Sequence, residues 1–196
     1  MSDVAKALWT PTGKTIANSR MNRFAQLANE FGDLHAWSIN QPEQFWSLVW
    51  DDCGVVGHKG ERSFVAAVPG SPMSTARFFP DAALSVVENM LATTGGGEAL
   101  VAIDEAGNRR SRSWDELRAR VSSIASALQA RGVVAGDRVV AWLPNSIEAI
   151  EVMLGAASIG AVFSSSSPDF GSNGVLDRFG QIEPKVLFAV DGYLYN

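Results

Sequence analysis

The sequence predicts an α/β fold, in which part of a helix-covered, mainly parallel sheet follows a helical N-terminal segment. After residue 113, amphipathic helical patterns and apolar runs of strand length alternate three times, with connections of only a few residues. The run Arg138–Leu143 is apolar almost throughout, as expected of a strand that helices cover on both faces. With 196 residues, of which 46% are hydrophobic, the chain is long enough to bury a substantial core.

Residues 1–75 are expected to form a helical, aromatic-rich N-terminal segment. This part holds four of the six tryptophans. Ser19 is a suitable N-cap for a helix whose apolar residues recur at helical spacing as far as Phe31, and Gly32 would end it. Asn40 and Glu43 have capping-box spacing ahead of a second short helix. Both helices are amphipathic, so each is expected to pack on another surface.

Residues 76–196 are expected to form an incomplete α/β portion. The segment Val68–Phe79, rich in proline, predicts an extended surface connection that leads into it. A third helix should follow, with Leu84, Val87, Met90 and Leu91 on its apolar face. The segments Ala99–Ile103 and Arg109–Ser113 flank a turn-rich stretch and predict a β-hairpin.

Three rounds of helix and strand complete the predicted domain. Ser113 and Glu116 form a capping box at the start of a long helix, which Gly132 should end. The remaining predicted elements are the strand Arg138–Leu143, a helix opened by Asn145 with Ile147, Ile150, Leu154 and Ala157 facing inward, the strand Ala161–Ser164, a helix through Val175, Leu176, Phe179 and Ile182, and the strand Val186–Val190. The sequence stops just after this strand, which predicts a truncation of a longer protein.

Composition and charge exclude several classes of protein. Sixteen basic and 21 acidic residues give a net charge of −5, which disfavours nucleic acid or an anionic membrane as a partner. A single cysteine, Cys53, cannot form an internal disulfide, and two histidines are too few for a Cys/His zinc site, so a reducing cytoplasm fits best and no metal site is expected. No N-terminal signal segment or membrane span is expected, because no apolar stretch approaches ~18 residues.

Two clusters that invite a catalytic interpretation have simpler ones. The loop Thr93–Glu98 is rich in glycine like a phosphate loop, but it lacks a lysine to reach a phosphate, which favours a plain connection. Asp51, Cys53 and His58 are close in sequence, yet no motif orients them as a nucleophilic site.

Two further segments leave a ligand contact open. Arg109, Arg110 and Arg112 could meet an anion, although such runs are more often a solvated strand edge. The serine-rich segment Ser164–Asp169 follows a predicted parallel strand and precedes a helix, where open α/β sheets bind ligands. Serine-rich turns are also common in plain loops.

Several segments of the second part have a recognisable sequence. They are Ala76-Arg-Phe-Phe-Pro80, Glu88-Asn-Met-Leu91, Gly136-Asp-Arg-Val-Val-Ala-Trp-Leu-Pro-Asn145, Ser165-Ser-Ser-Pro-Asp-Phe-Gly171 and Leu176-Asp-Arg-Phe-Gly-Gln-Ile-Glu-Pro-Lys-Val-Leu-Phe188. Together they resemble the acetoacetyl-CoA synthetases, a family of the acyl-adenylate-forming superfamily. The resemblance covers essentially the whole chain and is most specific after residue 160.

The resemblance implies an ATP-dependent ligase that uses Mg²⁺ and coenzyme A. Acetoacetate would form acetoacetyl-AMP, and coenzyme A would then displace AMP. The family's machinery is a Thr/Ser/Gly-rich loop ending in lysine, an aromatic-Thr-Glu segment, a ribose-binding aspartate and a lysine on a mobile C-terminal domain. None of these is found in residues 1–196, so the chain is expected to hold no catalytic residue and to be inactive alone.

The same resemblance implies a partial coenzyme A site. In acetyl-CoA synthetases, a Phe-Gly-Gly-Phe turn lies near the coenzyme A nucleotide, and Ser167-Pro168-Asp169-Phe170 occupies that place here. An arginine that contacts the same nucleotide is replaced here by Tyr195. Only Phe170 matches by identity, and a core aromatic is the alternative role for it.

The implied partners are the small molecules acetoacetate, ATP and coenzyme A, together with self-association of the chain through uncovered apolar surface. A non-catalytic α/β module that binds a ligand or a partner protein is the competing hypothesis. A reading frame that continues past Asn196 into a Lys-terminated phosphate loop would decide for the ligase.

Overall fold

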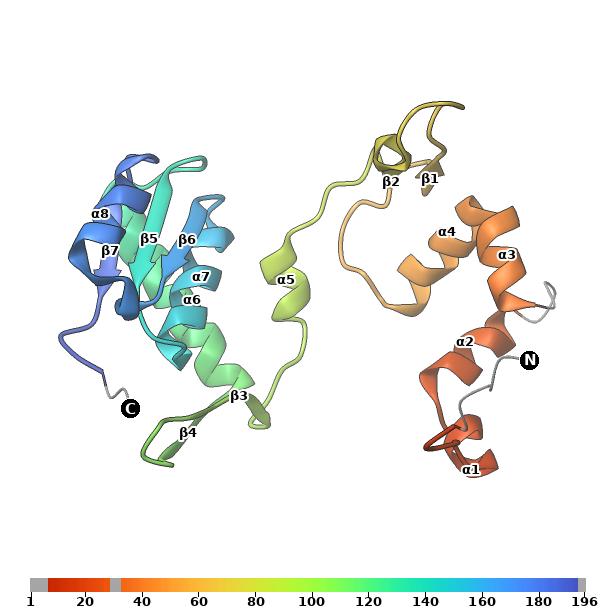
Figure 1. Cartoon of the computed structure of the whole chain (residues 1–196), viewed down its shortest axis with the longest axis horizontal. Helices are drawn as coiled ribbons and strands as arrows, with labels where there is room; N and C mark the ends of the chain where they lie inside the picture. The colour runs from red at the N-terminus through yellow and green to blue at the C-terminus, as the bar shows by residue number, and fades with distance from the viewer. Residues whose placement is uncertain (1–6, 29–32, 194–196) are drawn as a thin grey trace, which may run out of the picture. The chain divides into compact units, whose positions relative to one another are not determined.

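The computed structural model describes residues 7–28 and 33–193 of the chain (Figure 1). The chain divides into two units, Met1–Leu84 and Ser85–Asn196. The first unit is mainly helical, and the second contains a parallel sheet covered by helices. The α/β class that the sequence predicts is therefore confirmed. No helix within the described ranges is long and apolar enough to cross a membrane.

Short helices and one two-stranded ladder make up the first unit. Its elements are α1 (Gly13–Ala17), α2 (Arg20–Leu27), α3 (Leu34–Asn40), α4 (Pro42–Asp52), β1 (Phe64–Val65), the 3₁₀ turn η2 (Met73–Thr75) and β2 (Arg77–Phe78). Strand β2 pairs antiparallel with β1. The predicted connection Val68–Phe79 therefore contains a 3₁₀ turn and a short strand. A strand of two residues is too short to give a recognisable sequence pattern.

The helix boundaries of this unit correct two predictions. Ser19 caps α2 as predicted, since its side chain accepts a hydrogen bond from the Asn22 amide at 3.0 Å, but the helix ends at Leu27. The predicted stop at Gly32 lies outside the described residues. The predicted cap Asn40 is wrong, because it is the last residue of α3 and Gln41 caps α4. Pro42 sets this boundary, since proline is favoured at the first helical position and has no amide to donate.

Phe45 of α4 lies at the centre of an aromatic cluster. Its ring meets those of Phe24, Trp37 and Trp46 edge-on, with centroids 5.7, 5.3 and 5.4 Å away. Each such pair adds roughly 0.5–1.5 kcal/mol beyond the burial of its area. The aromatic residues of this half therefore hold α2, α3 and α4 together.

The second unit contains a hairpin followed by three rounds of helix and strand. Its elements are α5 (Val86–Met90), β3 (Glu98–Ile103), β4 (Arg109–Ser113), α6 (Trp114–Ala130), β5 (Arg138–Trp142), α7 (Ile147–Ser158), β6 (Val162–Ser166), the 3₁₀ turn η3 (Pro168–Phe170), α8 (Gly171–Gly180) and β7 (Val186–Ala189). The β3–β4 hairpin is antiparallel as predicted. The capping box of Ser113 and Glu116 is confirmed, and Gly132 follows α6 with a φ of +77°, a conformation that favours glycine.

Strand β5 is the centre of a three-stranded parallel sheet with the order β6-β5-β7. Val139, Val140 and Ala141 of β5 have no exposed surface at all. Val139 packs against α6 and α7 through Leu128 and Val152, whereas Val140 packs against α8. Because successive side chains of a strand point to opposite faces, α7 and α8 cover opposite faces of the sheet (Figure 1).

Five details of this unit differ from the sequence-based expectations. Ser146, not Asn145, is the N-cap of α7, and the inward residue near its end is Ala156 rather than Ala157. Strand β6 continues to Ser166, two residues past the predicted end, because pairing with β5 extends to Trp142. Leu176 of α8 is 71% exposed and does not belong to the core. Leu84 precedes α5 instead of lying on it.

The arginines of β4 are paired with carboxylates of the chain itself. Arg110 binds Glu148 through two hydrogen bonds of 2.8 and 3.0 Å, which lowers the pKa of Glu148 to about 2. This pair stabilises the fold at neutral pH and loses that contribution as the pH falls toward 2. Arg112 Nε lies 3.0 Å from Oε1 of Glu151, a fully buried carboxylate that Arg120 also contacts at 3.4 Å.

Arg110 and Arg112 are two residues apart on β4, and their partners Glu148 and Glu151 are three residues apart on α7. The two ion pairs therefore hold the hairpin against that helix. Arg109, on the opposite side of the strand, pairs with Glu98 across the hairpin at 2.7 Å. The alternative of an external anion on this cluster is therefore not needed, since internal carboxylates occupy all three guanidinium groups.

Arg112→Met is expected to lower the free energy of unfolding by about 3 kcal/mol, because the buried charge of Glu151 would keep only its longer contact with Arg120. Arg109→Met is the matched control, and it should change the stability much less than Arg112→Met does, because both partners of that pair are half-exposed to solvent. Urea unfolding followed by circular dichroism measures both variants. Equal losses of stability in the two would contradict a structural role for the Glu151 cluster.

Candidate functional site

The candidate site lies at the carboxyl edge of the parallel sheet, between β5 and β6. The chain leaves β5 through α7 on one face and leaves β6 through α8 on the other face. Strands β6 and β7 lie on opposite sides of β5, so the direction of winding reverses at this point. In open α/β sheets, ligands bind outside the carboxyl ends of the strands at such a switch point.

The turn that follows β6 is built by the predicted residues Ser167, Pro168, Asp169 and Phe170. Ser167 is the cap of η3, and its hydroxyl donates to Oδ2 of Asp169 at 2.7 Å. Proline at the first position of the 3₁₀ turn fixes the backbone without removing a needed donor. The sequence therefore locates this turn correctly, at the carboxyl end of a parallel strand.

A hydrogen bond joins this turn to the segment that follows β7. The Tyr193 hydroxyl donates to Oδ1 of Asp169, 24 residues earlier in the chain. Hydrogen bonds from Tyr193 and Ser167 lower the pKa of the Asp169 carboxyl below its usual value. The two segments thus meet at one edge of the sheet, whereas the predicted contact residue Tyr195 lies outside the described residues.

Phe170 is 52% exposed, so it is not the core aromatic that was its alternative role. Its ring lies against a cation, since the guanidinium carbon of Arg178 is 3.8 Å from the ring centroid. Arg178 comes from the last turn of α8 and was not predicted. Because Phe170 lies in the preceding 3₁₀ turn and is eight residues away, outside the i, i+3 and i, i+4 spacings of helical neighbours, the sequence pattern does not indicate this contact.

Two buried polar atoms lie at the carboxyl ends of the central strands. Trp142 and Ser166 are register partners across β5 and β6, and they share a sheet face with Val140. The indole nitrogen of Trp142 and the hydroxyl of Ser166 have no hydrogen-bond partner within the described part of the chain. Neither atom was predicted as a site atom, because the sequence does not reveal which polar groups lack partners.

The other sequence candidates are engaged in structural contacts. In the loop Thr93–Glu98, the Gly95 amide donates to the Asp115 carboxylate at 2.9 Å and the Gly97 carbonyl accepts from the Trp114 amide at 3.0 Å, so the loop is tied to the start of α6. The Asp115 carboxylate of α6 therefore occupies a loop amide that a phosphate would need.

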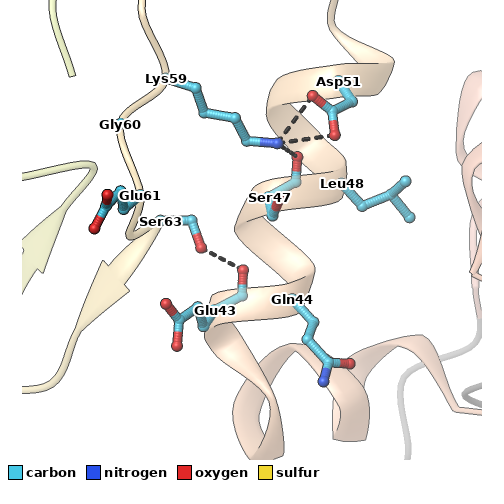
Figure 2. Close-up of a pocket in the computed structure, with 9 residues that line it drawn as sticks. All are labelled: Glu43, Gln44, Ser47, Leu48, Asp51, Lys59, Gly60, Glu61 and Ser63. Carbon is cyan, nitrogen blue, oxygen red and sulfur yellow. Dashed lines mark hydrogen bonds and ion pairs between the residues drawn. The ribbon is translucent and has the colours of Figure 1, made fainter. Parts of the chain in front are cut away.

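Asp51 lines a cavity of about 500 Å³ on α4 in the first unit (Figure 2). Lys59 crosses this cavity and binds both oxygens of Asp51 at 2.9 and 2.8 Å and the Ser47 carbonyl at 2.9 Å. The partner of Asp51 is thus a lysine, and among the described contacts neither Cys53 nor His58 joins it. Figure 2 also shows Ser63, another residue that lines the cavity, donating to the Glu43 carbonyl.

Within residues 7–28 and 33–193, no group of three or more His, Cys, Asp or Glu side chains is placed to hold a metal ion.

Residues 87–194, more than half of the chain, match the family model of the AMP-binding enzymes. The chain therefore belongs to the AMP-binding enzyme family. It is 45% identical over 199 residues to the acetoacetyl-coenzyme A synthetase of Rhizobium meliloti (strain 1021), a match that covers 97% of this chain and 30% of that protein. The acetoacetyl-CoA synthetase of Danio rerio is 41% identical over 202 residues, with 98% of this chain and 30% of that protein covered.

The fold is similar as well. The structure of acetoacetyl-CoA synthetase from Streptomyces lividans matches with a TM-score of 0.83 and 37% identity, over 97% of this chain and 31% of that one. The resemblance predicted from the sequence motifs is thus confirmed. The chain spans about 30% of the length of the curated relatives it matches.

Ser166→Ala is expected to leave the fold unchanged or to stabilise it by up to about 1 kcal/mol, because it removes a buried hydroxyl that has no protein partner. Ser63→Ala is the matched control, since Ser63 is buried to a similar extent but donates to the Glu43 carbonyl. It should destabilise the chain by about 1 kcal/mol. Thermal unfolding of the two variants measures the difference. A comparable loss in Ser166→Ala would mean that its hydroxyl does have a partner.

Proposed function

We propose that this chain is the N-terminal portion of an ATP-dependent acetoacetate–CoA ligase, which forms acetoacetyl-AMP and then acetoacetyl-CoA. The observation that carries the proposal is the similarity to acetoacetyl-CoA synthetases over 97% of the chain, in both sequence and fold. The single cysteine and the absence of an internal disulfide fit a cytoplasmic enzyme of this kind.

The reaction has two steps. A carboxylate oxygen of acetoacetate attacks the α-phosphorus of ATP, the bond to the β-phosphate oxygen breaks, and pyrophosphate leaves. The thiol sulfur of coenzyme A then attacks the acyl carbon of acetoacetyl-AMP, AMP leaves with the electron pair of the broken C–O bond, and the thiol proton passes to a base. Adenylation is needed because a carboxylate is a poor electrophile, whereas an acyl phosphate anhydride is a good one.

In this proposal the chain contributes an edge of the coenzyme A site, formed by Ser167, Pro168, Asp169 and Phe170 with Tyr193 beside them and Tyr195 following. Three features support this role. The turn lies at the switch point of the sheet, Phe170 is half-exposed there, and the Asp169–Tyr193 hydrogen bond holds the turn against the segment after β7. The adenylation machinery belongs to the rest of the longer protein.

The chain alone is expected to release no pyrophosphate from ATP in the presence of acetoacetate and Mg²⁺, because the family's lysine-ended phosphate loop and mobile lysine are not in its sequence. A longer protein that continues past Asn196 should support acetoacetate-dependent exchange of labelled pyrophosphate into ATP. Both are measured with the purified proteins. Release by the chain itself would overturn its assignment as a non-catalytic portion, and a longer protein inactive with every small carboxylic acid would favour a binding module instead.

Phe170→Ala in the longer protein is expected to raise the KM for coenzyme A severalfold, while pyrophosphate exchange changes little, because adenylation precedes binding of the thiol. Phe163→Leu in β6 is a suitable control, since Phe163 packs in the core on the face covered by α6 and α7. If Phe170→Ala lowers both half-reactions equally, the residue supports the fold and the proposed edge of the coenzyme A site is wrong.

A further inference from the structure

The guanidinium of Arg178 is presented at the candidate site by an aromatic ring. Its central carbon lies 3.8 Å from the centroid of the Phe170 ring, and both residues are exposed. A planar guanidinium stacked on a ring is held by cation–π attraction, yet its edge and its N–H groups stay free to meet a ligand. The stack therefore fixes the position of the charge without consuming its donors.

Arg178 forms no ion pair with a carboxylate in the described part of the chain. Among the residues that the structure describes, its hydrogen-bond partner is the Gly174 carbonyl, which accepts from Nη1 at 3.3 Å. The neighbouring carboxylate of Asp169 is held instead by Tyr193 and Ser167. By contrast, Arg109, Arg110 and Arg112 are each bound to a glutamate. A guanidinium has five N–H donors, so most of those of Arg178 are not used by the described residues.

Gly174 makes room for this stack. A Cβ at Gly174 would lie 3.2 Å from Nη1 of Arg178 and 3.2 Å from Cβ of Phe170, which is tighter than ordinary contact. Glycine inside a helix is unfavourable relative to alanine, so its presence in α8 calls for a local reason. The close approach of Phe170 and Arg178 supplies one.

We propose that Arg178 binds a phosphate group of the nucleotide part of the thiol substrate, at the carboxyl edge of the sheet. The inference rests on the proposed function, which supplies coenzyme A as the ligand. Arginine suits this role because its fork of N–H groups matches two phosphate oxygens and its charge persists at every physiological pH. Pre-orientation on Phe170 reduces the side-chain freedom that would be lost on binding. Coenzyme A offers two phosphate positions, the 3′-phosphate and the 5′-diphosphate.

The test uses the longer protein that contains this chain, with the variants Arg178→Gln and Arg178→Lys. Arg131→Gln is the matched control, because Arg131 is also an exposed arginine near a helix end whose Nη1 binds the carbonyl four residues earlier, Ala127, at 2.9 Å. Dissociation constants for coenzyme A are measured by calorimetry, together with kcat/KM for coenzyme A, 3′-dephospho-coenzyme A and pantetheine. Thermal unfolding of each variant checks that the fold is kept.

Arg178→Gln is expected to weaken the binding of coenzyme A about tenfold, and Arg178→Lys should lose less, because lysine keeps the charge but not the fork. With pantetheine, which has no phosphate, the ratio of wild type to variant should fall to about one. A loss that persists with 3′-dephospho-coenzyme A assigns Arg178 to the 5′-diphosphate, and a loss that disappears assigns it to the 3′-phosphate.

Gly174→Ala provides a second, independent variant. It retains every charge but crowds the stack, so it should weaken coenzyme A binding in the same direction as Arg178→Gln. The inference is overturned if Arg178→Gln weakens coenzyme A binding no more than Arg131→Gln does, or weakens the use of pantetheine equally. Failure of the proposed function has a different signature, namely no acyl transfer from any carboxylic acid. In that case, calorimetric measurement of coenzyme A binding still tests the role of Arg178. If coenzyme A does not bind measurably, the inference about Arg178 is overturned.

Discussion

The complete burial of Val139, Val140 and Ala141 at the centre of β5 is the constraint on which the second unit depends. Because neighbouring residues of a strand point to opposite faces, both faces of the sheet must be covered, so the connections from β5 and β6 have to run on opposite sides of the sheet. This requirement places β6 and β7 on either side of β5 and creates the reversal of winding between them. The position of the candidate site is therefore a consequence of how the core is covered, before any functional residue is considered.

Elements whose signals are local could be predicted from the sequence. The capping box at Ser113, the glycine that follows α6 and the continuous apolar run of β5 each act within a few residues, and all three have the predicted structure. Boundaries that depend on distant partners could not be predicted as well. Strand β6 runs on to Ser166 because β5 offers it a partner there, and no property of the serines themselves indicates this.

The candidate site shows the same division. The turn Ser167–Phe170 could be located from the order of the elements, because parallel strands direct their carboxyl ends to one edge. The contacts that define its chemistry join residues far apart in sequence. Tyr193 binds Asp169, although α8 and β7 lie between them in the sequence, and Arg178 of α8 packs on Phe170 of the preceding turn. The residues next to Tyr193 and Arg178 in the sequence therefore do not indicate these contacts. Charge alone was also misleading, since the arginine cluster of β4 serves internal carboxylates while the isolated Arg178 stays accessible.

The buried carboxylate of Glu151 has a consequence for how relatives of this chain can diverge. Its partner Arg112 lies 39 residues away, on a different element. A buried ion pair can be exchanged for apolar residues of similar volume at little cost, whereas the loss of one member alone is severe. The two positions are therefore expected to covary across an alignment, with Arg and Glu retained together or replaced together by apolar side chains. Relatives in which only one of the two residues has changed should be rare. Substitutions in the β3–β4 hairpin and in α7 are therefore expected to occur together at these two positions.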